Sequence, residues 1–181
     1  MSGNISQFIK SLSSHDLISW SGPAFRMHNP VWAWSPMSCE GAKRAGGRFN
    51  PKGSPALYLG LKVNTCLAEV SAGTSTKLLD PQVLCSYSIN IDGLLDLRPY
   101  HELFSSPWRL LRLQGGEPPG WQLYKAVEKR PEIKGFLVPS YQAEKEDNLV
   151  LLHWRHQEVK LHDPDGTMAA VYGDKFNVQP D

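Results

Sequence analysis

Two segments of the chain alternate apolar and polar residues with a period of two, which is typical of half-buried β-strands. In Pro55–Leu61 the leucines share one face, and Tyr58 lies on the opposite face between small residues, where another group could lie against its ring. Val83–Ile91 alternates throughout and predicts an antiparallel strand. Shorter apolar runs predict three further strands, within residues 135–140, 148–154 and 158–163.

Two other segments have helical spacing. Asn64–Gly73 is predicted to be a short helix that Asn64 caps and Gly73 ends. At about 100° per residue, Glu69 lies about 110° from the centre of the apolar face, so its side chain could be solvated or turned into a cleft. Residues 121–130 predict a second helix, which Pro131 ends.

The remaining segments are irregular in pattern. Residues 1–20 are expected to form a polar, loosely helical lead-in, and residues 23–50, rich in Gly, Pro, Ser and Trp, an ordered loop with one or two short strands. Strands outnumber helices and do not alternate with them, which favours an α+β fold of mainly antiparallel sheet with flanking short helices. We expect a single domain over residues 21–181, preceded by the lead-in.

Composition then limits the classes of function. The 181 residues carry a formal net charge of +1, which argues against a protein that coats nucleic acid or an acidic membrane. No apolar stretch approaches the roughly 18 residues of a membrane helix, and the N-terminus does not resemble a signal peptide. The cysteines, Cys39, Cys66 and Cys85, are odd in number and widely spaced, so we expect core fillers in a reducing cytosol rather than disulfides or a thiolate metal site.

The segment Arg44–Gly53 has the composition of a phosphate-binding loop. It holds three glycines, two arginines and one lysine in ten residues. Glycines let backbone N–H groups approach an anion, and the planar fork of an arginine can bind two phosphate oxygens at once. The spacing matches neither a Walker loop nor GxGxxG, so a solvated hairpin turn is the alternative interpretation.

Arg48, Tyr58 and Glu69 follow one another within 22 residues. A phosphate-binding fork, a ring on the non-core face of a strand and a flanking carboxylate could together hold a phosphorylated sugar with a flat ring at its anomeric carbon. The carboxylate would lie near the positive charge that develops as the glycosidic bond breaks. Taken singly, each is better explained as a solvated arginine, a tyrosine packed on a sheet and an acid on a helix surface.

The histidines and Ser140 carry weaker signals. His153 and His156 are three residues apart, which on a strand places them on opposite faces, and the other histidines form no ligand cluster, so no metal site is expected. Ser140 follows Pro139 without the GxSxG context of a hydrolase. Its hydroxyl is expected to bond to local backbone or to a ligand.

Taken in order, these motifs resemble the RES-domain family, which is named for its Arg, Glu and Ser. The resemblance rests on GGRFNPKGSPALYLGL, CLAEV, VPS and NLVLLHW, with supporting pieces from about Phe25 to about Pro164. It implies an ADP-ribosyltransferase-like catalytic domain over residues 21–181, from a cytoplasmic bacterial toxin of a toxin–antitoxin pair. The family's residues fall on Arg48, Tyr58, Glu69 and Ser140, and two further recurrent, substrate-binding positions fall on Arg26 and Asn148.

The resemblance also implies a reaction, namely cleavage of the nicotinamide–ribose bond of NAD+ without a metal, which depletes the cell of NAD+. Arg48 would grip the diphosphate, and Tyr58 would stack on the nicotinamide or its ribose. Glu69 would bond to the ribose hydroxyls and stabilise an oxocarbenium-like transition state. Ser140 would orient the substrate or a neighbouring loop. The expected protein partner is a cognate antitoxin or immunity protein that blocks the active site.

Other functions remain open at this point. If phosphate, a protein or a nucleotide replaced water as the acceptor, the protein would be an NAD+ phosphorylase or an ADP-ribosyltransferase. A non-catalytic nucleotide- or RNA-binding module would use Arg44, Arg48 and Lys52 as a phosphate patch and tryptophans as stacking platforms, although the near-neutral charge argues against it. A homodimer could form if Trp32 and Trp34 are exposed as an apolar patch.

Overall fold

The computed structural model describes residues 4–12, 17–72 and 81–176. Its strands are β1 (Leu17–His28), β2 (Leu57–Gly60), β3 (Val83–Asp96), β4 (Gly135–Pro139), β5 (Asp147–Leu151) and β6 (Val159–Leu161). Its α-helices are α1 (Ile5–Lys10), α2 (Glu40–Ala45), α3 (Val63–Ser71), α4 (Trp108–Leu113), α5 (Pro119–Val127) and α6 (Thr167–Tyr172). Short 3-10 segments are η2 (Pro30–Trp32), η4 (Arg98–Phe104) and η5 (Gly173–Lys175).

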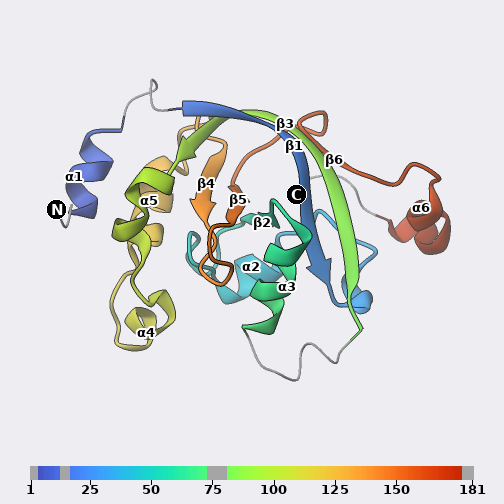
Figure 1. Ribbon diagram of the computed structural model, residues 1–181, viewed down its shortest axis with the longest axis horizontal. Coiled ribbons are helices and arrows are strands. Elements are labelled where there is room, and N and C mark those ends of the chain that lie inside the picture. Colours follow the sequence, from blue (N-terminus) through green and yellow to red (C-terminus); the bar gives the residue numbers. More distant parts are fainter. Residues whose placement is uncertain (1–3, 13–16, 73–80, 177–181) are drawn as a thin grey trace.

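The strands form one sheet that closes on itself. They pair in the order β1-β2-β5-β4-β3-β6, and β1 also pairs with β3 along most of its length. The β3–β4 pair is parallel and the other pairs are antiparallel. Because β1 meets β2 at one end and β3 meets β4 at the other, the long β1–β3 ribbon curves over the short central strands (Figure 1). The expected α+β class with a mainly antiparallel sheet is confirmed.

The central strands separate two hydrophobic cores. The leucine face predicted for Pro55–Leu61 is confirmed, since Leu57 and Leu59 are buried against β1 and β3 together with the leucines of β5. Tyr58 and its cross-strand neighbour Val150 face the opposite way, toward a second core formed with η4 and α5. Tyr58 packs at the margin of that second core, which leaves part of its ring free to line a cavity.

The N-terminal half departs from the sequence prediction. The loosely helical pattern of the lead-in appears as α1, whose apolar side chains pack against the second core. β1 begins at Leu17 and runs to His28, and α2 follows from Glu40, so the segment expected to be a loop with one or two short strands over residues 23–50 also contains a helix, while residues 33–39 and 46–50 are irregular as expected. Gly22 and Pro23 are residue types that are rare in strands, so the sequence pattern does not predict β1 here. Pairing with β3 outweighs their low strand propensity.

Two further details of the prediction are tested by α3 and the cysteines. The N-cap of α3 is Lys62, without a side-chain cap, so Asn64 lies inside the helix and its predicted capping role is wrong. Gly73, predicted to end this helix, lies outside the described residues. All three cysteines are buried and none forms a disulfide, as expected of core fillers. No helix in the described ranges is both long enough and apolar enough to cross a membrane.

His28 is a buried, neutral imidazole at the end of β1. Its Nε2 lies 3.4 Å from the hydroxyl of Tyr87, and that hydroxyl donates to the carbonyl of Pro36 at 2.8 Å. Because the tyrosine proton is donated to Pro36, the hydroxyl can accept a hydrogen bond from the imidazole of His28. Burial, reinforced by the positive charge of Arg26, lowers the pKa of His28 to about 3.

We expect His28 to make the fold acid-sensitive, lowering the free energy of unfolding by about 2 kcal/mol between pH 7 and pH 5. The unfolded chain takes up a proton here near pH 6.5 and the folded chain only near pH 3. The unfolded state therefore binds more protons in this window, and stability is lost as the pH falls. Urea unfolding at both pH values tests this: His28→Asn should flatten the dependence and exposed His101→Asn should not. An unchanged slope in His28→Asn would contradict the assignment.

Candidate functional site

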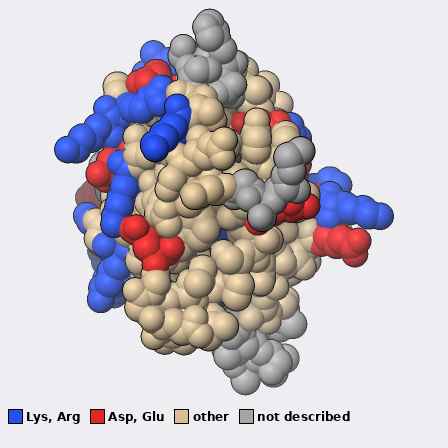
Figure 2. All heavy atoms as spheres, turned by 90° about the vertical axis from the view of Figure 1, so that its left-hand side faces the viewer, with Lys and Arg blue, Asp and Glu red and all other residues tan. Residues whose placement is uncertain are grey.

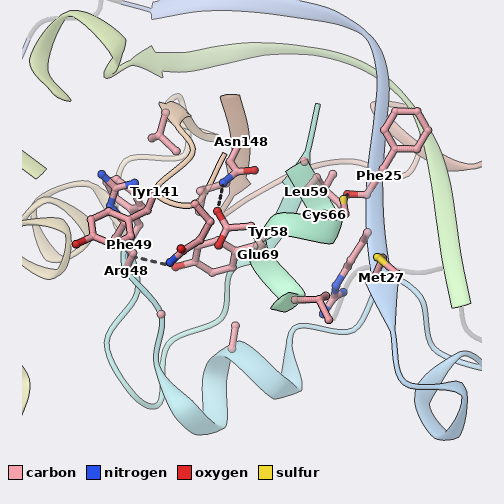
Figure 3. Close-up of a pocket in the computed structure, with 18 of the residues that line it drawn as sticks. Phe25, Met27, Arg48, Phe49, Tyr58, Leu59, Cys66, Glu69, Tyr141 and Asn148 are labelled. Atoms are coloured by element: carbon pink, nitrogen blue, oxygen red, sulfur yellow. Dashed lines mark hydrogen bonds between the residues drawn. The ribbon is translucent and has the colours of Figure 1, made fainter. Parts of the chain in front are cut away.

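A cavity of about 360 Å³ opens between α3, α4 and the loop that precedes β2. Figure 3 shows Arg48 and Tyr141 at one end, Phe25 and Met27 at the other, and Glu69 between them. The sequence-predicted residues that line this cavity are Arg26, Arg48, Tyr58, Glu69 and Asn148. Ser140 completes the group by contacting the carboxylate of Glu69. The fold therefore brings all of the predicted site residues together.

The loop between α2 and β2 turns inward, so its interpretation as a solvated hairpin turn is wrong. Gly46 ends α2 with φ +73°, a conformation that favours glycine. Phe49 and Asn50 are then buried. Arg44 and Lys52 stay exposed and do not line the cavity. Of the three cations of Arg44–Gly53, Arg48 is the one that lines the cavity.

The guanidinium of Arg48 is held mainly by backbone carbonyls. Nε and Nη2 donate to the carbonyl of Phe104 at 3.3 and 3.0 Å, and Nη1 donates to the carbonyl of Pro139 at 3.0 Å. Three of the five N–H groups of a guanidinium are thus already used. Arg48 therefore ties the end of η4 to the end of β4 and fixes one wall of the cavity.

Arg48 remains positively charged in the cavity, where two aromatic rings pack against its guanidinium. Its Cζ lies 5.0 Å from the ring centroid of Phe49 and 5.5 Å from that of Tyr141. Burial lowers the pKa of Arg48, while the negative charge of Glu69 acts in the opposite direction. An arginine pKa starts so far above neutrality that the group stays protonated. The cavity thus holds a fixed cation at one end and a carboxylate near its middle.

Tyr58 is fixed by its hydroxyl. The hydroxyl donates to Oδ1 of Asn50 at 2.7 Å and accepts from the backbone N–H of Phe49 at 2.9 Å. Asn50 in turn donates to backbone carbonyls of the loop, including that of Ser54 at 2.8 Å. Burial raises the pKa of Tyr58 well above its ordinary value, so the phenol stays neutral. The ring is rigidly placed and can offer the cavity only an apolar face.

Gly47 leaves no room for a side chain beside Tyr58. A Cβ at this position would lie 2.4 Å from the hydroxyl oxygen of Tyr58 and 2.6 Å from Oδ1 of Asn50. We expect Gly47→Ala to displace the tyrosine and lower the free energy of unfolding by about 1–3 kcal/mol, as overpacking usually does. Gly41→Ala is the matched control, because its Cβ would meet nothing within 4 Å. Chemical denaturation compares the two, and equal stability would contradict this packing.

Glu69 is turned into the cavity by two residues distant in sequence. Its Oε1 accepts from Ser140 Oγ and from Asn148 Nδ2, both at 2.9 Å (Figure 3 shows the second bond). Ser140 Oγ also accepts from the backbone N–H groups of Gln142 and Ala143, so the predicted bond to local backbone is present. Within the described residues no donor reaches Oε2 of Glu69. That oxygen is available to a ligand.

Arg26 lines the far side of the cavity and supports its wall. Nη1 donates to the carbonyl of Ser38 at 2.9 Å and to that of Pro36 at 3.3 Å. Arg26 therefore fastens the loop between β1 and α2 against the site. The amide of Asn148 is likewise used by the protein, since it binds Glu69. Arg26 and Asn148 therefore hold other parts of the site in place through hydrogen bonds within the protein.

The structure adds residues that sequence reasoning missed. Asn50, fully buried, lies in the quoted motif GGRFN, but an Asn-Pro pair signals only a turn. Tyr141, Trp108 and Arg109 also line the cavity, and no pattern marks them in the sequence. The described ranges hold no group of three or more His, Cys, Asp or Glu side chains placed to bind a metal. β5 ends before His153, so this residue lies in a bend and not on the strand expected for it.

An α+β domain whose cavity combines a guanidinium, a neutral tyrosine and a positioned carboxylate is typical of a small-molecule enzyme. A family model of the RES domain matches residues 23–171, and the chain belongs to the RES-domain family. A chain in the crystal structure of the M. tuberculosis MbcT–MbcA toxin–antitoxin complex has the same fold. It gives a TM-score of 0.65 and 24% sequence identity over 88% of this chain and 89% of that chain. No match to a curated protein was found.

Proposed function

We propose that the protein is a toxin-like enzyme that cleaves the nicotinamide–ribose bond of NAD+. The observation that carries the proposal is the carboxylate of Glu69, which Ser140 and Asn148 hold in the same cavity as Arg48 and Tyr58. Membership of the RES-domain family supports NAD+ as the substrate. The cavity volume lies within the range of small-molecule sites, and NAD+ would fill and extend beyond it.

The reaction needs little chemistry from the protein. The bond between the nicotinamide nitrogen and the ribose carbon breaks with its electron pair leaving on nicotinamide, which becomes neutral, and positive charge develops on the ribose. Glu69 would stabilise that charge electrostatically and accept hydrogen bonds from the ribose hydroxyls. Water then adds to the ribosyl cation, which gives ADP-ribose, nicotinamide and one proton. Tyr58 would hold the flat face of the nicotinamide or its ribose in place.

The acceptor distinguishes three versions of this proposal. Inorganic phosphate in place of water would give ADP-ribose phosphate, and a protein or nucleotide would become ADP-ribosylated, all from the same cavity. Incubation of the purified protein with NAD+, with and without phosphate, followed by chromatography and mass spectrometry of the products, decides between them. We expect nicotinamide release with free ADP-ribose. A folded protein that releases no nicotinamide under any of these conditions would overturn the proposal.

The non-catalytic module is the competing proposal. Its three-cation patch loses Arg48, whose guanidinium is bound to backbone carbonyls inside the cavity. On the face shown in Figure 2, most Lys and Arg lie along the left edge and a smaller group lies at the right edge, both beside Asp and Glu, and other residues cover most of the middle. RNA binders usually present a broader basic surface. Calorimetry with single-stranded RNA beside NAD+ tests this, since salt-sensitive RNA binding without NAD+ binding would favour the module.

We also propose a regulated setting for the enzyme. The similar fold in a toxin–antitoxin complex supports a cognate protein partner, and we propose that this partner covers the cavity. Trp32 is 55% and Trp34 37% exposed, as the homodimer hypothesis requires, although exposure alone does not select a partner. We place the protein in the bacterial cytoplasm and assign its catalytic unit to residues 21–181. Size-exclusion chromatography with light scattering tests the dimer.

A further inference from the structure

The helix α4 contributes a cation to the cavity that the family motif does not include. Trp108 and Arg109, at the start of α4, line the cavity, whereas Leu110 and Leu113 are exposed. Arg112 Nη1 donates to the carbonyl of Ala45 at 2.8 Å, which ties α4 to the end of α2. The helix is therefore anchored beside the loop that carries Arg48, with its first turn at the mouth of the site.

Arg26, Arg48 and Arg109 are the guanidinium groups that line this cavity, and they differ in what they already bind. Arg48 donates to backbone carbonyls through all three of its nitrogens, and Arg26 does so through Nη1 alone, so the fold already uses part of each guanidinium. Among the residues that the structure describes, Arg109 makes neither a hydrogen bond nor an ion pair. Its Cζ lies 4.7 Å from the ring centroid of Trp108, a contact that leaves the N–H groups free.

This difference separates two tasks that a single arginine cannot perform fully. A diphosphate presents two negative charges and several oxygens, and a planar guanidinium with free N–H groups binds such oxygens in pairs. Arg48 supplies charge and a fixed wall, but few free donors. Arg109 supplies a complete donor set on an exposed side chain that can move onto a ligand. The carboxylate of Glu69 excludes anions from its own part of the cavity.

We propose that Arg109 binds the diphosphate of a dinucleotide substrate and thereby selects dinucleotides over nicotinamide compounds with one phosphate or none. The inference rests on the proposed function, because it identifies the part of NAD+ that the mouth of the cavity recognises. Arg109 binds the diphosphate equally in the ground state and the transition state, since the diphosphate is remote from the bond that breaks. Its contribution therefore appears in KM and not in kcat.

The experiment measures kcat and KM for NAD+, nicotinamide mononucleotide and nicotinamide riboside with wild-type protein, Arg109→Gln and Arg109→Lys. We expect Arg109→Gln to raise KM for NAD+ about tenfold or more with kcat within about twofold. KM for the riboside, which lacks phosphate, should not change, and Arg109→Lys should recover part of the loss by restoring the charge. Added salt should weaken NAD+ binding less in Arg109→Gln than in wild type.

Arg44→Gln is the matched control, because it removes the same charge from an exposed residue near the cavity that does not line it. An equal rise in KM in both variants, an unchanged KM in Arg109→Gln, or an equal rise for NAD+ and the riboside would each overturn the proposal. If wild-type protein releases no nicotinamide, the proposed function fails separately. Calorimetric titration of the same variants with NAD+ then decides whether Arg109 binds the diphosphate.

Discussion

Replacing Glu69 by Gln is expected to lower kcat for nicotinamide release by about 10²–10³. The substitution keeps the size of the side chain and an oxygen that can still accept from Ser140 and Asn148. It removes only the negative charge that would face the developing ribosyl cation. NAD+ binding should change much less than kcat, because that cation is absent from the ground state.

The measurement is a kinetic comparison of nicotinamide release, accompanied by thermal unfolding to verify the fold. Glu128→Gln at the C-cap of α5 serves as the control, since this exposed carboxylate lies outside the cavity and its removal should leave kcat unchanged. Glu69 itself is exposed at the cavity, so its loss should affect stability little. Full activity in Glu69→Gln would remove this residue from the mechanism.

Arg48→Ala is expected to damage both stability and activity. The carbonyls of Phe104 and Pro139 lose the cation that joins them, and we expect the free energy of unfolding to fall by about 2–4 kcal/mol. Arg48→Lys should lose nearly as much, because an ammonium cannot reach both carbonyls as a planar fork does. NAD+ cleavage should fall in both variants as the wall between η4 and β4 loosens.

Denaturant unfolding of Arg48→Ala, Arg48→Lys and Arg44→Ala separates these effects. Arg44 is exposed and makes no contact with the cavity, so its variant should stay within about 0.5 kcal/mol of wild type. Wild-type stability in Arg48→Ala would mean that the bonds to the two carbonyls do not hold the wall. A fully stable Arg48→Lys with lost activity would instead assign Arg48 to substrate binding alone.

The sequence predicts the strand side of the site well. The alternation around Tyr58 correctly assigns the leucines to one core and the tyrosine ring to the other face, because a period of two leaves only one arrangement of faces. β1 is the contrasting case. Gly22 and Pro23 interrupt its pattern, and only the long pairing with β3, which is distant in sequence, makes the segment a strand.

The contacts within the site are beyond sequence reasoning for a physical reason. The position of Glu69 on its helix leaves its direction open, and its partners Ser140 and Asn148 lie 71 and 79 residues further along the chain. Arg48 binds backbone carbonyls, and every residue carries a backbone carbonyl, so the sequence does not show which residue provides the acceptor. Family resemblance supplies the residues, but not the bonds that hold them.

The hydrogen bonds that Ser140 and Asn148 donate to Glu69 have a consequence for protein synthesis. The carboxylate is encoded early, but its amide partner Asn148 lies on β5, which the ribosome makes much later. A growing or prematurely terminated chain that stops before this strand has the acid without the group that aims it. The contact between Glu69 and Asn148 can therefore form only after most of the polypeptide has left the exit tunnel.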